Sequence, residues 1–502
     1  MLCLNKRHFN ESYKEFGKLQ KLVGAILAGI ITILIFGVTT DFQFLSSDRE
    51  LIVESGPINP PRFNKVLQAW TNFEQDIYNP VPQSLWILTA RFTADISNAK
   101  GPNDPVELSP AVFHGLNLSF HVLSTMLVLG ILALLIPRGF APFLGAMVFA
   151  LHPLQVQAVA WIKNFDLVCG VFFALLAVYQ YLVYSTKRES ASRNVRPMRH
   201  YYTATIAFVL AIFSHPAMVV APLIAGALEK LVPSPRSSLL RSKKPVWPLA
   251  SWLFLAIGPA LLAVSSQTTG VLAAQISLWE RPLIAGDAIT FYLYKLLFPI
   301  NLGPDYGRTP GYVMAQWWGY FSWLVPVLIC LMLMYWREKP RTWFAVASGT
   351  FFFGVLPFLG FVLFEAQGNS TVADRYVYLA MLGPAVLLAY LASLKKKPAL
   401  KLVVFAIAVT SCYFAQKQVK IWQNDQVLWQ YALKVNPNSS IANRLLADAS
   451  RLAGDNDKAK VYYEKVLETN QSDPEPRFHL ANIYLDESEF AKAKSTFLQV
   501  LK

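Results

Sequence analysis

The sequence predicts an all-α protein that crosses a membrane many times and ends in a helical repeat domain. Of its 502 residues, 54% are hydrophobic, and the mean hydropathy is +0.37. Apolar runs close to the roughly 20 residues that span a bilayer recur along residues 1–416. Residues 417–502 are more charged and repeat with a period of 34 residues. We therefore expect a polytopic membrane domain over 1–416 and a repeat domain over 417–502.

The first apolar run, residues 22–38, is predicted to remain as a membrane anchor. It is longer than the apolar core of a secretory signal, and the stretch TTDFQF follows it instead of a small-residue cleavage site. Ten further apolar segments lead to an expectation of about eleven crossings. These eleven segments lie near 22–38, 112–136, 140–159, 167–184, 201–214, 217–232, 246–264, 320–336, 342–364, 376–394 and 402–416.

Basic clusters set the expected orientation, because Lys and Arg collect in cytoplasmic loops. This rule places the N-terminus and all five basic clusters on the cytoplasmic side. The clusters lie at 6–21, 187–199, 236–244, 337–341 and 395–401. The clusters account for the net charge of +14, so nucleic acid is not an expected partner. The cysteines lack the spacing of a zinc site or a disulfide framework; they are Cys3, Cys169, Cys330 and Cys412.

The segment 282–302 is long enough to cross but carries Asp287, Lys295 and Pro299. If it crossed, the cluster at 337–341 would face outward, so we expect an interfacial or re-entrant helix on the outer side. The outer face then holds the long first loop and the repeat domain. It comprises 39–111, 152–166, 265–319, 365–375 and everything after 416, and the working site is expected there.

The repeat domain is predicted from residues that recur at matching positions. Leu446, Ala447, Ala459, Tyr463, Val466 and Leu467 return 34 residues later as Leu480, Ala481, Ala493, Phe497, Val500 and Leu501. A helical period of 34 residues with small Ala positions and an aromatic residue is typical of tetratricopeptide repeats. A generic amphipathic helical tail is the alternative.

Two outer segments carry carboxylates that could take part in chemistry. Asp48, in the stretch SSDRELI, could accept a proton from a hydroxyl that attacks a lipid-borne substrate. A solvated loop with Asp–Arg pairing is the alternative. Asp166 ends the stretch HPLQVQAVAWIKNFD and could hold a sugar hydroxyl, while Lys163 could face a phosphate; Lys163 could equally snorkel beside Trp161 at the interface.

Histidines form a further candidate group. His114, Asn117 and His121 lie at i, i+3 and i+7, so they share one stripe of the second crossing. Hydrogen bonding between helices is the preferred explanation over metal binding, although His152 and His215 could act as further partners.

The stretch VADRYVYLA places a cation at the outer start of a helix. Arg375 and the positive end of the helix dipole would act together on an anionic head group such as a phosphate. The alternative is an interfacial belt of Tyr376 and Tyr378 with Asp374 as a helix cap. If Arg375 were not the phosphate ligand, Lys163 or Lys295 would be the next candidates.

These stretches, in this order, resemble the transmembrane and tetratricopeptide-repeat O-mannosyltransferase-like proteins of the GT-C glycosyltransferase superfamily. The stretches are SSDRELI, YNPVPQSLWIL, FHGLNLSFH, FALHPLQVQAVAWIKNFDL, ERPLIAGDAITFYLYKLLFPINLGPDY and ADRYVYL. The resemblance implies a GT-C membrane domain that transfers a sugar from a polyprenyl-phosphate carrier to a protein hydroxyl. It implies Asp48 as the base and Arg375 as a ligand of the carrier phosphate, and it leaves a divalent metal open.

The chain departs from that family at three positions. Ser47 precedes Asp48 where the family pairs two acids, Gln157 stands where it favours an acid, and Pro216 ends its Ser-Lys-Glu stretch. Two functions are therefore expected: a lipid-dependent glycosyltransferase whose repeats hold a protein, or an inactive membrane scaffold that binds a partner subunit. The expected location is the bacterial cytoplasmic membrane with periplasmic repeats, or the endoplasmic reticulum with lumenal repeats.

Overall fold

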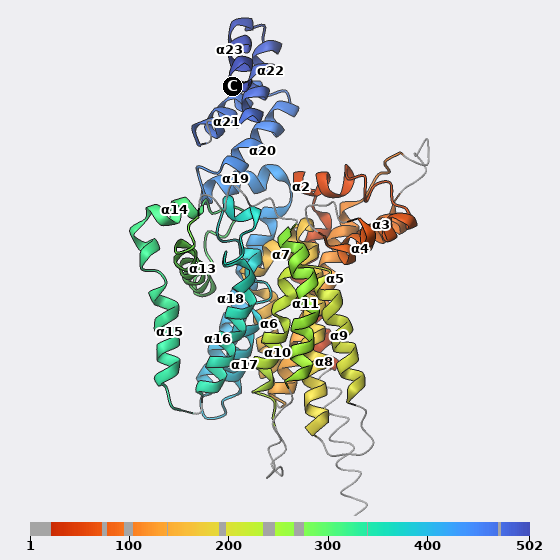
Figure 1. Ribbon diagram of the computed structural model, residues 1–502, viewed down its shortest axis with the longest axis vertical. Coiled ribbons are helices and arrows are strands. Elements are labelled where there is room, and N and C mark those ends of the chain that lie inside the picture. Colours follow the sequence, from red (N-terminus) through yellow and green to blue (C-terminus); the bar gives the residue numbers. More distant parts are fainter. Residues whose placement is uncertain are drawn as a thin grey trace, which may run out of the picture.

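The computed structural model is all-helical. It describes residues 22–72, 78–94, 104–137, 139–189, 197–233, 246–265, 276–338, 340–469 and 473–501, and no strand occurs in these ranges. The helices of the body run along the long axis of the molecule, and the tail extends from one end of the body (Figure 1). The body helices are α5 (Pro110–Leu135), α6 (Ala141–Leu151), α8 (Phe165–Glu189), α9 (Met198–Ile212), α10 (Ala221–Glu229), α11 (Trp247–Ser265), α15 (Leu324–Tyr335), α16 (Arg341–Val355), α17 (Leu382–Ser393) and α18 (Pro398–Val419).

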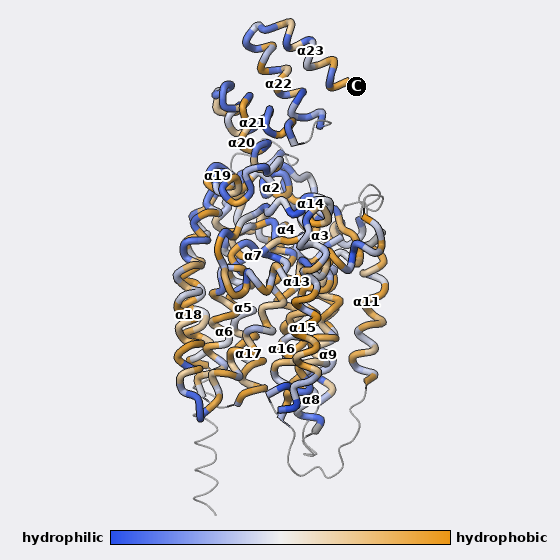
Figure 2. The backbone as a smooth tube through the Cα atoms, turned by 90° about the vertical axis from the view of Figure 1, so that its left-hand side faces the viewer, coloured by the Kyte–Doolittle hydropathy of each residue, from blue (hydrophilic) through white to orange (hydrophobic). Residues whose placement is uncertain are grey.

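Five helices of the described residues are long and apolar enough to cross a membrane. They are Leu22–Asp41, Pro110–Leu135, Ile162–Arg188, Trp317–Tyr335 and Pro398–Trp422. The pair Ala141–Leu151 and Pro153–Ala160 qualifies as a sixth if the two pieces count as one span. Each of the eleven predicted segments contains a helix, but α9, α10, α16 and α17 are shorter than a full crossing requires, and α11, with 19 residues, is not among the five. Their apolar character extends along the body in Figure 2.

Small residues let the body helices approach closely. A Cβ atom on Gly145 of α6 would lie 2.6 Å from the Ala385 carbonyl oxygen of α17. A Cβ atom on Gly354 of α16 would lie 2.5 Å from the Ala380 Cα atom, just before α17. Such distances are impossible for any larger residue, and close backbone approach is how apolar helices gain packing energy where lipid offers no hydrophobic contrast.

A 50° bend separates α6 from the segment that continues it, Pro153–Ala160. Pro153 cannot donate a backbone hydrogen bond, so a continuous helix is broken there. The ring of His152 caps the next turn, because its Nδ1 accepts from the Leu154 N–H at 3.3 Å. The bend places α7 (Val156–Ala160) and the turn Ile162–Asn164 at the end of the body that also carries the tail (Figure 1).

The helices outside the body bundle gather at that same end. They are α2 (Ser46–Asp48), α3 (Phe63–Thr71), α4 (Pro80–Thr93), α13 (Glu280–Leu297) and α14 (Pro310–Ala315). Figure 1 shows the end of α8, the start of α9, and the α17–α18 connection at the opposite end, together with the end of α15 and the start of α16, as expected from their basic clusters. The clusters at 6–21 and 236–244 lie outside the described residues.

The charged segment 282–302 does not run with the body helices. It forms α13, which Figure 1 views nearly along its axis, so α13 crosses the long axis instead of following it. This placement agrees with an interfacial helix. Its neighbour α15 has no buried residue among its twelve and stands apart from the other body helices.

The tail consists of α19 followed by two helical hairpins. Their bounds are α19 (Asp425–Val435), α20 (Ser440–Leu452), α21 (Asn456–Thr469), α22 (Pro474–Asp486) and α23 (Phe490–Val500). The first residues of α22 and α23 follow those of α20 and α21 by the 34 residues of the sequence period. Ala447, Ala459, Tyr463, Leu480 and Ile483 are buried together between the hairpins.

Candidate functional site

The acidic turn, residues 46–48, is pinned against the segment that follows α7. Asp48 is 0% exposed. Its Oδ1 accepts from the Lys163 N–H at 2.9 Å, and its Oδ2 accepts from the Leu45 N–H at 3.1 Å. Burial raises the pKa of Asp48 to about 7, although the two backbone hydrogen bonds lower it. The alternative of a solvated loop is therefore wrong: Asp48 is enclosed, and both of its oxygens are occupied.

Trp161 connects the acidic turn to the turn that carries Arg375. Its indole Nε1 donates to the Ser47 Oγ at 3.1 Å. The guanidinium carbon of Arg375 lies 5.8 Å from the centre of the Trp161 ring. Ser47 thus acts here as a hydrogen-bond acceptor for Trp161.

Arg375 lies in the short helix Asp374–Val377 and makes three contacts with two neighbours. Its backbone N–H donates to the Gln157 Oε1 at 2.8 Å, its guanidinium donates to the Tyr376 hydroxyl at 3.1 Å, and it lies 4.7 Å from the centre of the Tyr376 ring. Tyr376 in turn stacks on Phe358 with ring centres 4.5 Å apart. Among the described residues, Arg375 pairs with no carboxylate. The guanidinium is therefore fixed in place without being neutralised.

Asp166 and His215 lie beside this cation. The Asp166 Oδ2 is 3.9 Å from the His215 Nε2, and 16% of the Asp166 side chain is exposed. Burial lowers the pKa of His215; Arg375 adds to this effect and Asp166 opposes it. The effect of Arg375 on the pKa of His215 links the His215–Asp166 pair to this cation, and the lowered pKa leaves the imidazole neutral at pH 7.

Lys163 contributes its backbone but not its side chain to the contacts described above. The N–H of Lys163 bonds Asp48, whereas the side chain is exposed and pairs with no carboxylate of the described residues. The ammonium group remains available to an anion at this surface.

The other predicted histidines lie in the interior of the body. His152 uses its second ring nitrogen on the Leu296 carbonyl at 3.1 Å, so both nitrogens are occupied. His121 contacts the Tyr378 hydroxyl at 2.8 Å and the Ala150 carbonyl at 3.1 Å. His114 is buried in a T-shaped ring contact with Phe42, and neither of its ring nitrogens has a hydrogen-bond partner among the described residues. The contacts of His121 and His152 agree with hydrogen bonding between helices, whereas those of His114 do not. The structure does not bring these histidines into the Arg375 cluster.

Lys295 is also bound internally. Its Nζ donates to the carbonyl oxygens of Ile300 at 2.7 Å and Asn301 at 3.1 Å, and it lies 5.1 Å from the centre of the Tyr306 ring. The ammonium group thus closes the end of α13. It also acts through space on Asp374, whose charged form it favours.

Asp374 does not cap a helix, as the alternative for this stretch supposed. It is buried, and its Oδ1 accepts from the Tyr306 hydroxyl at 2.6 Å. Burial raises the pKa of Asp374 to about 7, against the effects of Tyr306, Lys295 and Arg375. Sequence reasoning missed this pair because 68 residues separate its members; the only signal was that both lie in the stretches that carry the family resemblance.

A loop at 302–308 joins this cluster to the tail. Tyr306 holds Asp374, while the neighbouring Asp305 accepts from Ser439 at 2.6 Å and from Asn436 at 3.1 Å. The tail also reaches the acidic turn, because the Asp425 Oδ1 accepts from the Ser46 N–H at 3.1 Å. Both turns of the candidate site are therefore tied to the first helices of the tail.

No group of three or more His, Cys, Asp or Glu side chains suited to a metal ion occurs in the described part of the chain. Comparisons of the whole sequence with protein-family models and with curated proteins find no match.

Proposed function

We propose that the protein is a glycosyltransferase that takes a mannose-like sugar from a polyprenyl-phosphate carrier and transfers it to a protein hydroxyl at the outer membrane face. The observation that carries this proposal is the fixed, unneutralised guanidinium of Arg375 beside Asp166 and His215. An arginine held in this way is suited to a phosphate, for which it offers charge-assisted hydrogen bonds.

In this mechanism the bond between the anomeric carbon and the carrier phosphate breaks as the acceptor oxygen attacks from the opposite face. Arg375 balances the charge that the leaving phosphate gains, and Asp48 takes the proton of the acceptor hydroxyl. A raised pKa near 7 suits a general base at neutral pH. Because Asp48 is enclosed, the acidic turn has to open for the hydroxyl to reach it.

The topology belongs to the same proposal. We infer eleven crossings, since the shorter helices α6, α9, α10, α11, α16 and α17 run beside the long ones in Figure 1. The hairpins of the tail are interpreted as tetratricopeptide repeats that hold a protein, supported by helix starts 34 residues apart. The membrane is taken as the bacterial cytoplasmic membrane with a periplasmic tail; the endoplasmic reticulum with a lumenal tail is the alternative.

A second function is favoured by the state of Asp48. Its oxygens are both bound by backbone N–H groups, and neutral Ser47, Gln157 and Pro216 stand where the related pattern has acids. An inactive scaffold that keeps the fold and binds a partner subunit through the repeats would need no open base.

The proposal is tested by carrier binding to the full chain in phospholipid nanodiscs. Arg375→Ala is expected to remove a contact of about 1.5–3 kcal/mol, which weakens binding of a defined polyprenyl phosphate roughly tenfold to 150-fold. Arg341→Ala, at the exposed start of α16, is the matched control. Unchanged binding by Arg375→Ala would reject Arg375 as the ligand and direct the search to Lys163 or Lys295.

A further inference from the structure

Helix α3 carries apolar side chains that remain on the surface of the protein. Ala69 is buried in a core that α3 shares with α4. Phe63, Leu67 and Trp70, at i, i+4 and i+7, lie on one face of α3 and are 58%, 69% and 36% exposed. Phe92 of α4 is 76% exposed, and its ring lies 6.3 Å, centre to centre, from that of Phe63. We call Phe63, Leu67, Trp70 and Phe92 the α3–α4 patch.

The contacts of Trp70 show which way the α3–α4 patch faces. The ring of Trp70 lies 5.7 Å, centre to centre, from that of Phe213, the residue that follows α9. Its indole Nε1 donates to the Ser84 Oγ at 3.0 Å. Helix α9 starts at the end of the body opposite the tail, so Phe213 marks its other end, near the tail (Figure 1). The face of α3 that carries Trp70 is therefore turned toward the ends of the body helices.

The α3–α4 hairpin also reaches sideways beyond the body. Figure 1 shows α3 and α4 across the long axis at the tail end, extending past α9. Helix α9 exposes Tyr202 (60%) and Ile206 (62%), and its neighbour α11 exposes Phe254 (74%). In a membrane, lipid covers an apolar lateral surface of this kind. The α3–α4 patch continues that surface at its edge.

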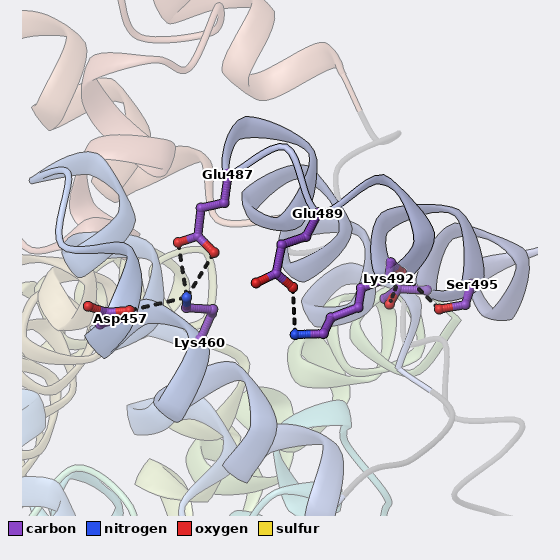
Figure 3. Close-up of polar contacts among 7 residues, drawn as sticks. Asp457, Lys460, Glu487, Glu489, Lys492 and Ser495 are labelled. Atoms are coloured by element: carbon purple, nitrogen blue, oxygen red, sulfur yellow. Dashed lines mark hydrogen bonds and ion pairs between the residues drawn. The ribbon is translucent and has the colours of Figure 1, made fainter.

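A cation borders the patch, and its state differs from that of a lysine in the charged tail. In the tail, Lys460 donates to Glu487 at 2.9 Å and lies 3.1 Å from Asp457, as Figure 3 shows. Arg91 of α4 is exposed and pairs with no carboxylate of the described residues. Its guanidinium carbon lies 5.6 Å from the centre of the Phe63 ring. A cation beside Phe, Trp and Leu side chains is typical of helices in the headgroup layer, where lipid phosphates carry negative charge.

We propose that the α3–α4 patch lies in the headgroup layer of the membrane leaflet at the tail end of the body. Phe63, Leu67 and Phe92 contact the acyl chains, and Arg91 contacts a lipid phosphate. A soluble partner protein would approach from the water, whereas the patch is turned toward the apolar body and overhangs its lateral surface. The phospholipid leaflet is therefore the occupant that this geometry favours.

This attachment bears on the acidic turn, because the turn is joined to the same unit. Phe44 and Ile52, on either side of residues 46–48, are buried in one core with Ala69 of α3 and Trp86 of α4. A leaflet that holds the α3–α4 patch thus sets the depth of the acidic turn relative to the membrane surface. The attachment requires only that the body lies in a membrane, so it does not depend on the proposed sugar transfer.

Nitroxide labels on the full chain test the proposal in nanodiscs of phosphatidylcholine and phosphatidylglycerol. The four native cysteines are replaced by alanine, and Leu67→Cys carries the label. Collision rates are measured with oxygen, which concentrates among acyl chains, and with a water-soluble nickel chelate. We expect the oxygen-to-nickel ratio at Leu67→Cys to exceed that at Gln68→Cys, the adjacent exposed position on the polar side of α3.

Two further positions calibrate the depth of the label. Leu328→Cys, at a position of α15 that is 61% exposed, reports the acyl-chain region, and Ser495→Cys, on the exposed surface of α23, reports water. The ratio at Leu67→Cys should lie between these two, because the headgroup layer lies between the two environments.

A charge exchange tests the contact of Arg91 with lipid phosphate. Arg91→Glu, which repels the phosphate, should lower the oxygen-to-nickel ratio at Leu67→Cys. Arg91→Lys keeps the charge and is the matched control, so the ratio should not change. Equal ratios in the two variants would overturn the assignment of Arg91.

Two results would overturn the membrane attachment itself. Equal ratios at Leu67→Cys and Ser495→Cys would show that the patch faces water. A label at Leu67→Cys that neither reagent reaches would show that protein covers the patch, either another segment of this chain or a second copy. Neither measurement involves sugar transfer, so failure of the attachment and failure of the proposed activity are distinguishable.

Discussion

Asp48 and Asp166 are two carboxylates at the same end of the body, yet their surroundings are opposite. Asp48 is fully buried, and backbone N–H groups occupy both of its oxygens. Asp166 is partly exposed; one oxygen accepts from the Leu167 N–H, and the other is 3.9 Å from a neutral imidazole near Arg375. The carboxylate that the sequence motif favours is therefore the enclosed one, and the carboxylate beside the free cation is open.

The difference teaches that the identity of a base and its availability are separate properties. A pKa near 7 gives Asp48 the proton affinity that a base needs, but the same burial that raises the pKa keeps a hydroxyl away. The side chain of Asp166 is accessible to a hydroxyl, but it is not enclosed by the protein. Substitutions that separate these two properties show which carboxylate takes part in transfer.

The largest expected effect is on sugar transfer. Asp48→Asn keeps the shape of the side chain and removes the base, so the rate should fall by roughly a hundredfold to ten-thousandfold. The assay uses purified protein with a defined lipid-phosphate sugar donor, and Asp166→Asn is the matched variant. If Asp166→Asn shows the larger loss, the open carboxylate is the base. If wild type with an intact fold transfers from no donor, the scaffold function is favoured.

A smaller effect is expected on the pH dependence of stability. The pKa of Asp48 is about 7 in the folded chain and near 3.9 in an unfolded one, so the folded state binds more protons between these values. The free energy of unfolding therefore falls as pH rises from about 4 to about 7. Thermal unfolding across this range should show a shallower slope for Asp48→Asn, with the remainder due in part to Asp374. An unchanged slope would mean that Asp48 is not buried as described.

The smallest expected effect is that of Lys163→Ala on stability. Only the backbone N–H of Lys163 bonds Asp48, and its side chain is exposed, so the free energy of unfolding should change by less than about 0.5 kcal/mol. Replacement by proline, which removes the N–H, should be clearly destabilising. Equal effects of the two substitutions on thermal unfolding would show that the side chain, not the backbone, supports the acidic turn.

Much of the fold could be predicted because it depends on local signals. Apolar runs, basic clusters and the 34-residue period led to the helices, to the placement of the basic connections away from the tail, and to the paired helices of the tail. The number of crossings was less accessible, since α9 and α16 are only 15 residues long and their depth depends on neighbours. Eleven crossings thus stay a prediction.

The candidate site was harder to predict because its contacts join distant parts of the chain. The enclosure of Asp48 depends on Lys163, 115 residues away, and that of Asp374 depends on Tyr306. Charge and motif order led to the prediction of Arg375, Asp166 and Asp48 as site residues, which stays a prediction. They could not reveal that the polar atoms of His152 and Lys295 are hydrogen-bonded to the backbone. Nothing local in the sequence specifies such long-range partners.

The loop at 302–308 helps to fix the position of the tail relative to the body. Asp305 accepts a hydrogen bond at the start of α20, and Tyr306 donates one to the turn that carries Arg375. Asp425 of α19 accepts one from the acidic turn. A protein segment bound to the hairpins would therefore lie in a fixed direction and at a fixed distance from Arg375. In the proposed transfer, this geometry would set the number of residues between the bound segment and the acceptor hydroxyl.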